Sequence, residues 1–167
     1  MMTVLPNEVL HALKMAMQNE SDTIRVYQHM FKKVKNSKTR QMLRHLINEE
    51  HFHEQRIKEK YREGGGQFPL NEWDSELPNR EHLLDIELEN LTVLELINLA
   101  MQVEKVSRDF YKVQYKRAAD VEVKLIFDWL ARQEEDHIKS LQQEYESHQN
   151  YHEVRLSDLD EEVPGEV

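Results

Sequence analysis

Hydrophobic residues recur every three or four positions in four long segments of this chain, a spacing typical of amphipathic helices. The first segment runs from about Pro6 to Val34. One helical face of it carries Leu10, Leu13, Met17, Glu20, Ile24, Tyr27, Phe31 and Val34. The other three segments follow Asn36-Ser37, Thr92 and Asp120. The pattern therefore predicts an all-α protein with four long helices.

Residues at the segment ends support these boundaries. Ser37 is the expected N-cap of the second helix, which should stop at the three glycines 64–66. Thr92 and Glu95 form a capping-box pattern at the start of the third helix, and Asp120 is the expected cap of the fourth.

The lengths of the connections predict the topology. A few residues separate the first helix from the second and the third from the fourth, so each pair should form an antiparallel hairpin. The connection over about 64–91 is long enough to return along the whole bundle, with a short helix expected at 80–89. We expect one domain over 1–147 and an acidic, loosely ordered C-terminal tail over 148–167.

Acids and histidines interrupt the apolar stripe of every helix at mid-length. They are Glu20, Glu50, His53, Glu104, Glu134 and His137. Glu20, Tyr27, Glu50 and His53 each recur, as the same residue type, 84 positions later. The chain therefore reads as a duplicated helical hairpin whose mid-length polar residues converge in the core.

Four carboxylates in a low-dielectric core must be neutralised. They can take up protons within a metal-free hydrogen-bonded network, or two divalent cations can balance their four negative charges. Each Glu-x-x-His pair puts both side chains on one helix face, so they can bind one ion jointly. Two such pairs with two single glutamates form the ligand set of di-iron and di-manganese carboxylate bundles.

Composition narrows the chemistry further. The chain has 167 residues, no cysteine and a net charge of -10, so thiolate zinc and iron–sulfur sites are excluded. Such an acidic chain is a poor partner for nucleic acid or an anionic membrane. No stretch is apolar enough to span a bilayer, and no signal peptide is evident, so we expect a cytoplasmic protein. The other histidines, His51 among them, lie off the stripe and should be surface groups.

With these residues the chain resembles the ferritin-like superfamily and, within it, the rubrerythrin-like di-iron proteins. The motifs are Glu20 with Tyr27, Glu49-Glu50-x-x-His53, Glu104 with Tyr111, and Gln133-Glu134-x-x-His137. The resemblance covers about 6–147 and implies a ferritin-like four-helix bundle of two antiparallel hairpins joined by a long crossover.

The resemblance also implies roles for these residues. Glu50 and Glu134 would bridge two iron ions, although Mn or Zn stays open for one or both positions. Glu20 and His53 would complete one position, and Glu104 and His137 the other. Tyr27 and Tyr111 would hydrogen-bond to the ligating carboxylates and orient them.

Three departures from the family pattern are visible. There is no cysteine-bound iron module, so a separate electron donor is expected. Ser107 stands where rubrerythrins usually carry an extra glutamate. Arg108 takes the place of Ile24 in the repeat, and it can either pair near the site or extend its head to solvent over its aliphatic stem.

The leading functional hypothesis is an oxidoreductase that reduces H2O2 or O2 or oxidises Fe(II), in the manner of a rubrerythrin-like peroxidase or ferroxidase. Such an activity fits a role in oxidative stress, and the resemblance suggests a homodimer. Two alternatives are iron binding or storage without turnover, and a metal-free structural or partner-binding bundle.

Overall fold

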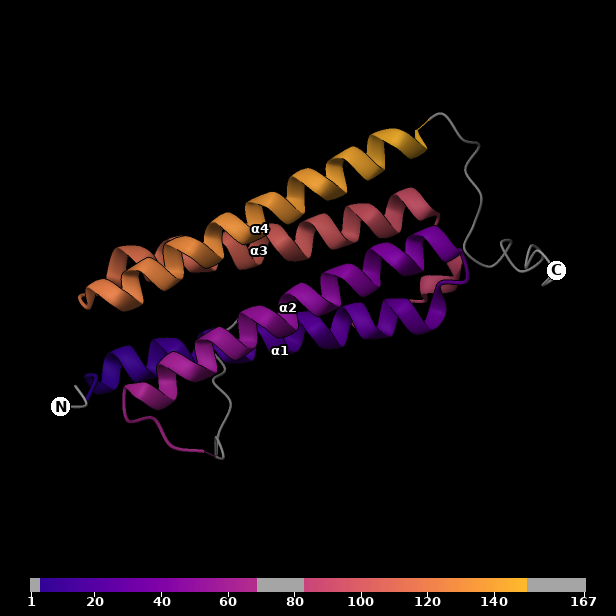
Figure 1. The fold of residues 1–167 in the computed structure, drawn as a ribbon. Helices are drawn as coiled ribbons and strands as arrows, with labels where there is room; N and C mark the ends of the chain where they lie inside the picture. The colour runs from indigo at the N-terminus through magenta and orange to yellow at the C-terminus, as the bar shows by residue number, and fades with distance from the viewer. Residues whose placement is uncertain (1–3, 69–82, 150–167) are drawn as a thin grey trace, which may run out of the picture.

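The computed structural model describes residues 4–68 and 83–149, and four long helices account for most of them (Figure 1). The helices are α1 (Asn7–Lys33), α2 (Ser37–Glu63), α3 (Val93–Arg117) and α4 (Val121–His148). Each coincides with a segment predicted from hydrophobic periodicity. The all-α prediction is confirmed.

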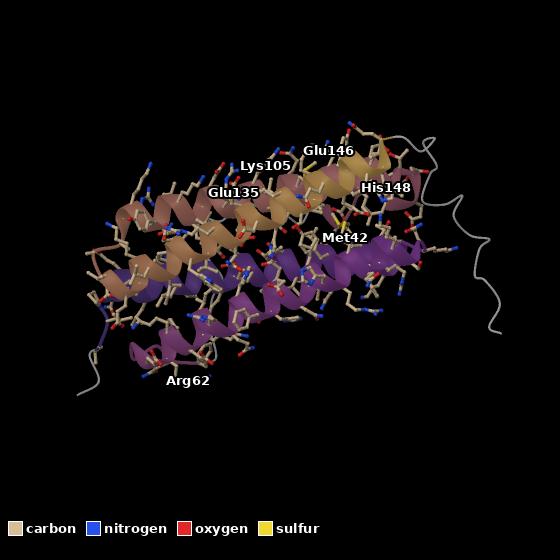
Figure 2. The ribbon with its side chains drawn as sticks, turned by 45° about the horizontal axis from the view of Figure 1, so that its top comes forward. Met42, Arg62, Lys105, Glu135, Glu146 and His148 are labelled. Atoms are coloured by element: carbon tan, nitrogen blue, oxygen red, sulfur yellow. The ribbon has the colours of Figure 1, made fainter. Side chains whose placement is uncertain are left out.

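Two antiparallel hairpins, α1–α2 and α3–α4, lie side by side to form the bundle (Figure 1). Charged side chains such as Arg62 and Glu146 project from its outer faces (Figure 2). Within the described ranges, no helix carries an apolar run that could cross a membrane.

Side-chain caps define the helix starts. The predicted N-cap of α2 is wrong by one residue, because Asn36 accepts the hydrogen bond from the Thr39 backbone N–H at 2.9 Å. Ser37 is instead the first helical residue. The capping box of Thr92 and Glu95 is present as predicted.

The other predicted helix ends also agree with the structure. Asp120 Oδ1 accepts from the Val123 N–H at 2.9 Å and caps α4. At the end of α2, Gly64 is the C-cap and Gly65 has φ +89°, a conformation that residues with a Cβ rarely adopt.

The crossover is described at its two ends. Its last part contains a 3₁₀ helix, η2 (Leu88–Asn90), and Leu88 is fully buried in the core. Of the short helix expected at 80–89, residues 80–82 lie outside the described ranges, and the rest shows no α-helix. Of the predicted tail, His148 still belongs to α4, and residues 150–167 lie outside the described part of the chain.

The core consists of two apolar clusters separated by a polar layer. One cluster includes Met30, Leu43 and Leu96, and the other includes Leu13 and Phe127. Each helix contributes side chains from one half to the first cluster and from the other half to the second. The mid-length acids and histidines lie between these two halves. Packed apolar side chains therefore flank the polar layer on both sides along the bundle.

The buried face of α3 differs from the predicted stripe at two places. Ser107 is buried where the repeat placed Arg108, the counterpart of Ile24, and Gln114 is buried where a continued stripe of three- and four-residue steps predicts Tyr115. The residues three and four positions after Glu104, Ser107 and Arg108, both lie roughly on the same helix face as Glu104. In the structure Ser107 is the buried one. Arg108 is left at the flank of the bundle.

Candidate metal centre

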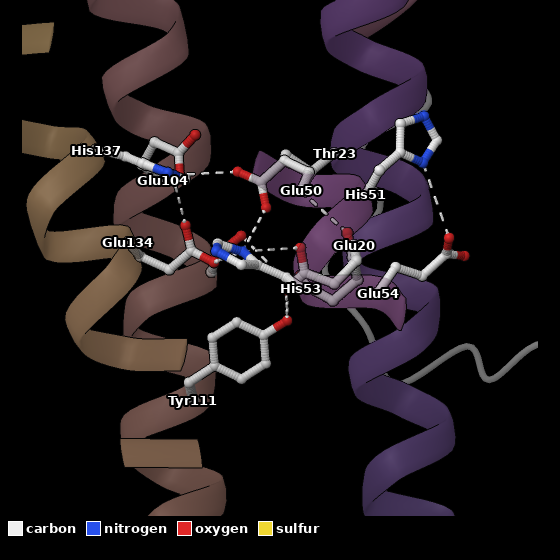
Figure 3. Close-up of polar contacts among 12 residues, drawn as sticks. Glu20, Thr23, Glu50, His51, His53, Glu54, Glu104, Tyr111, Glu134 and His137 are labelled. Atoms are coloured by element: carbon white, nitrogen blue, oxygen red, sulfur yellow. Dashed lines mark hydrogen bonds and ion pairs between the residues drawn. The ribbon is translucent and has the colours of Figure 1, made fainter. Parts of the chain in front are cut away.

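All six predicted ligands converge in the polar layer between the two hairpins (Figure 3). Helices α1 and α3 each contribute one glutamate, and α2 and α4 each contribute a Glu-x-x-His pair. The four glutamates and His53 are fully buried, and His137 is 7% exposed. The structure thus brings together every residue that the sequence selected, although their role as metal ligands stays a prediction.

Each histidine lies at the centre of a set of carboxylates. His53 Nδ1 is 3.0 Å from Glu50 Oε2, 3.7 Å from Glu20 Oε2 and 3.8 Å from Glu134 Oε1. The two imidazole rings of His53 and His137 stack, with centroids 5.4 Å apart. The first half of the site therefore combines one histidine with carboxylates from three different helices.

The second half of the site likewise has one histidine surrounded by three carboxylates. His137 Nδ1 is 3.2 Å from Glu50 Oε1, 3.3 Å from Glu134 Oε2 and 3.4 Å from Glu104 Oε2. Glu50 and Glu134 thus direct one oxygen to each histidine. They occupy the positions that both halves share.

Two groups of buried residues each have donor atoms that lie within 4.8 Å of one another, close enough to hold a metal ion. One group is Glu20, Glu50, His53 and Glu134; the other is Glu50, Glu104, Glu134 and His137. A third group combines the half-buried Glu49 with the two histidines. The repeat places Gln133 at the position equivalent to Glu49, so the second hairpin has no matching carboxylate there.

The donor set fits divalent metal ions because several of its buried atoms lack hydrogen-bond partners. Among the described residues these include both carboxylate oxygens of Glu134, Glu20 Oε2 and Glu50 Oε1. A buried carboxylate oxygen without a partner is costly, and a cation would satisfy it. Oxygen with imidazole ligation suits iron, manganese or zinc.

The metal-free site relieves its charge by binding protons. Burial and the neighbouring Glu50 charge raise the pKa of the Glu20 carboxyl to about 8. Burial, together with the charges of Glu50 and Glu104, raises the pKa of Glu134 well above its usual value. Both carboxyls therefore hold a proton at neutral pH in the metal-free protein.

The histidines are protonated as well. Burial alone would lower the pKa of His53, but contacts with the Glu20 and Glu50 carboxylates outweigh it and raise the pKa to about 10. The same balance, led by Glu104, raises the pKa of His137. Burial would raise the pKa of Glu50, yet its contacts with the two histidines hold that pKa below its usual value.

Two tyrosines connect the hairpins across the site. Tyr27 on α1 donates its hydroxyl hydrogen bond to Glu104 Oε1 on α3. Tyr111 on α3 donates to Glu20 Oε1 on α1 (Figure 3). Each tyrosine therefore orients the carboxylate of the opposite hairpin, and burial raises the pKa of both phenols. The predicted contact of each tyrosine with a carboxylate is present. The spacing of residues along the helices did not predict that each tyrosine would bond to the glutamate of the other hairpin.

Two sets of contacts near the site were not predicted from the sequence. Asn19 and Ser107 are buried and lie next to Tyr111. The rings of Trp129 and His53 form a T-shaped contact with centroids 5.2 Å apart, and Arg56 lies over the same indole at 4.8 Å. In the sequence, Ser107 stands out only as a departure from the family pattern, and Asn19 only by its adjacency to Glu20.

The remaining polar candidates lie away from the site. Arg108 pairs with the Asp109 and Glu135 carboxylates at 2.9 and 3.0 Å, at the bundle surface. It therefore pairs with carboxylates outside the predicted ligand set. His51 is exposed and faces Glu54, away from the cluster (Figure 3).

Metal binding is expected to release protons and to strengthen as pH rises. Divalent ions must displace one proton from each of the Glu20 and Glu134 carboxyls and one from each of the two imidazoliums. Since these folded-state pKa values are raised, protons compete more strongly as pH falls through 8 toward 6. Titration calorimetry with Zn(II) at pH 7, in buffers of different ionisation enthalpy, should show release of up to four protons. An uptake of protons, or affinity that does not change with pH, would contradict this assignment.

Comparisons with known proteins agree with this geometry. A family model described as Rubrerythrin matches residues 11–145 and also residues 95–163. A comparison with curated protein sequences finds no match.

Three solved structures share the fold. A bacterioferritin from Rhodobacter capsulatus, described with a metal-free dinuclear site and haem iron, superposes with TM-score 0.67 at 18% identity, covering 87% of this chain and 88% of that one. A hypothetical protein from Pyrococcus furiosus gives 0.60 at 23% identity, covering 83% and 88%. A conserved hypothetical protein from Mycobacterium tuberculosis gives 0.62 at 11% identity, covering 83% and 98%.

Proposed function

This chain belongs to the rubrerythrin family, and on that basis we propose that it is a di-iron protein that reduces H2O2 or O2 or oxidises Fe(II). The proposed ligands are Glu20, Glu50, His53, Glu104, Glu134 and His137. Glu50 and Glu134 would serve both ions, with Glu20 and His53 completing one position and Glu104 and His137 the other.

One observation carries this proposal. The two buried donor groups share Glu50 and Glu134, and both oxygens of Glu134 lack hydrogen-bond partners in the described part of the chain. A purely structural network would be expected to satisfy its buried oxygens. A pair of divalent cations would satisfy them and would also balance the four carboxylate charges.

When bound, two neighbouring iron ions can each supply one electron, which together meet the two-electron demand of a peroxide. The residues of the chain provide the setting for that chemistry. The two apolar clusters flank the polar layer and limit the access of water to it. Tyr27 and Tyr111 hold Glu104 and Glu20 in place by hydrogen bonds.

The two alternatives remain as outcomes of the test. Iron storage requires a shell-forming assembly that holds many irons per chain. A metal-free bundle requires Glu20 and Glu134 to remain protonated in the native protein. Repeated reduction of H2O2 or O2 would draw its electrons from a separate electron donor. Iron storage and a metal-free bundle would need no such donor.

The test is to load the full chain with Fe(II) under anaerobic conditions and then to add H2O2 or O2 separately. We expect near-ultraviolet absorption of ferric iron to grow, with one H2O2 consumed for each pair of Fe(II) ions. Loaded protein that neither changes its absorption nor consumes oxidant would refute the redox proposal. Many irons per chain in large particles by light scattering would instead favour storage, and fewer than one ion per chain after iron-replete growth would favour the metal-free bundle.

A further inference from the structure

The hydrogen bonds around the two crossing tyrosines are not equivalent. Tyr111 donates to Glu20, and its oxygen also accepts a hydrogen bond from the Asn19 side-chain amide at 3.0 Å. The same amide nitrogen lies 3.2 Å from Ser107 Oγ. Asn19 is 2% exposed and Ser107 is 1% exposed, so this chain of hydrogen bonds is shielded from water. Tyr111 is thereby held from both sides.

The matching positions around Tyr27 carry different residues. The repeat places Val103 where the first hairpin has Asn19, and a valine side chain donates no hydrogen bond. Thr23 takes the place of Ser107, but its hydroxyl donates to the Asn19 backbone oxygen at 3.0 Å. The Tyr27 hydroxyl also lies 3.4 Å from the Ala100 carbonyl oxygen, so its proton has a second acceptor besides Glu104.

This difference acts on the two carboxylates. Glu20 has its Oε1 held by a tyrosine whose own oxygen is fixed, and its Oε2 is left facing His53 at 3.7 Å. Glu104 is held by a tyrosine whose proton can turn to another acceptor. A ligand that is oriented in advance costs less to order when a metal binds, and hydrogen bonds to ligands commonly change metal affinity by about 10–100-fold.

We propose that Asn19 is a positioning residue that acts through Tyr111 to fix Glu20, and that it thereby makes the position of Glu20 and His53 the tighter of two metal sites. Glu104 retains the freedom to reorient, so the position of Glu104 and His137 is the weaker and more exchangeable one. This inference rests on the proposed binding of two metal ions. It assigns the asymmetry of the centre to buried residues outside the proposed ligand set.

The test is a Co(II) titration of the full chain, followed by cobalt absorption and calorimetry. The wild type should bind two ions in two resolved steps. Asn19→Val, which installs the residue that the repeat has at the other tyrosine, should weaken the tight step by about tenfold and leave the weaker step unchanged. Thr23→Val is the matched control, because it removes the buried hydroxyl that takes the place of Ser107 in the repeat and donates to the Asn19 backbone oxygen, and both steps should persist.

A double-mutant cycle separates positioning from general loss of structure. The effect of Asn19→Val should vanish in a Tyr111→Phe background and persist in a Tyr27→Phe background. Should Asn19→Val fail to fold, Ser107→Ala, which removes the second acceptor of the Asn19 amide, should weaken the same tight step to a smaller extent.

The outcomes of this test are distinct. An unchanged ratio of the two affinities in the folded variants, or an equal effect in both phenylalanine backgrounds, overturns the inference while two-ion binding stands. A wild type that binds fewer than two cobalt ions refutes the proposed dinuclear site itself.

Discussion

Replacing Glu134 by glutamine is expected to abolish the binding of both metal ions while the metal-free bundle stays folded. Glu134 belongs to both buried donor groups, and its two oxygens lie 3.8 Å from His53 Nδ1 and 3.3 Å from His137 Nδ1. Glutamine keeps the shape but removes the negative charge and one oxygen. Metal analysis should fall from two ions per chain to fewer than one.

The same substitution should spare the fold because the wild-type carboxyl is already neutral there. Burial raises the pKa of Glu134 well above its usual value, so it carries a proton at pH 7 when no metal is bound. A glutamine amide resembles that protonated acid in size and charge. The free energy of unfolding of the metal-free protein should therefore change by less than about 1.5 kcal/mol, measured by denaturant titration.

Two further variants make the result specific. Glu135→Gln changes the neighbouring carboxylate, which is partly exposed and pairs with Arg108, and should leave two ions bound. Glu20→Gln changes a member of only one donor group and should leave one ion bound. Retention of two ions by Glu134→Gln, or equal losses in Glu134→Gln and Glu135→Gln, would contradict the shared role of Glu134.

Removing the metal ions from the wild type is expected to lower Tm by about 8–16 °C. Ligands that bind only the folded state add about 4 kcal/mol when their free concentration is roughly 1,000 times Kd. For a chain of this size each kcal/mol corresponds to about 2–4 °C. The effect should be large here because chelation leaves a buried site in which Glu20 and Glu134 must take up protons and in which, among the described residues, several oxygens lack hydrogen-bond partners.

Scanning calorimetry before and after dialysis against a chelator measures this difference. The gap between loaded and metal-free protein should widen from pH 6 to pH 8, because protons on Glu20 and the histidines compete less as pH rises. Glu134→Gln serves as the control, and its Tm should not respond to the chelator. A wild-type Tm that is the same with and without chelator would contradict metal-linked stability.

The sequence predicted the helices and the convergence of the six polar residues for a simple physical reason. Glu-x-x-His fixes two side chains on one helix face, and the repeat places that pair at mid-length in both hairpins. Antiparallel hairpins of equal length then bring the mid-points together. Both the helix-face geometry and the symmetry of the two hairpins can be read from the spacing of residues in the sequence.

Features that depend on contacts between helices could not be predicted in this way. A stripe with steps of three or four residues does not decide between Ser107 and Arg108 as the buried residue of α3, because packing against α1 makes that choice. Tyr27 and Tyr111 hydrogen-bond across hairpins, and spacing along one helix is silent about a partner on another. Asn36 and Ser37 are both good caps, and only the backbone geometry selects between them.

Anomalous X-ray scattering from crystals of the iron-loaded full chain tests the dinuclear site most directly. We predict two iron peaks about 3.5–4 Å apart between Glu50 and Glu134. One should lie beside His53 and Glu20, and the other beside His137 and Glu104. A single peak, peaks only outside the polar layer, or no peak between the two shared glutamates would contradict the proposal that these six residues hold a metal pair.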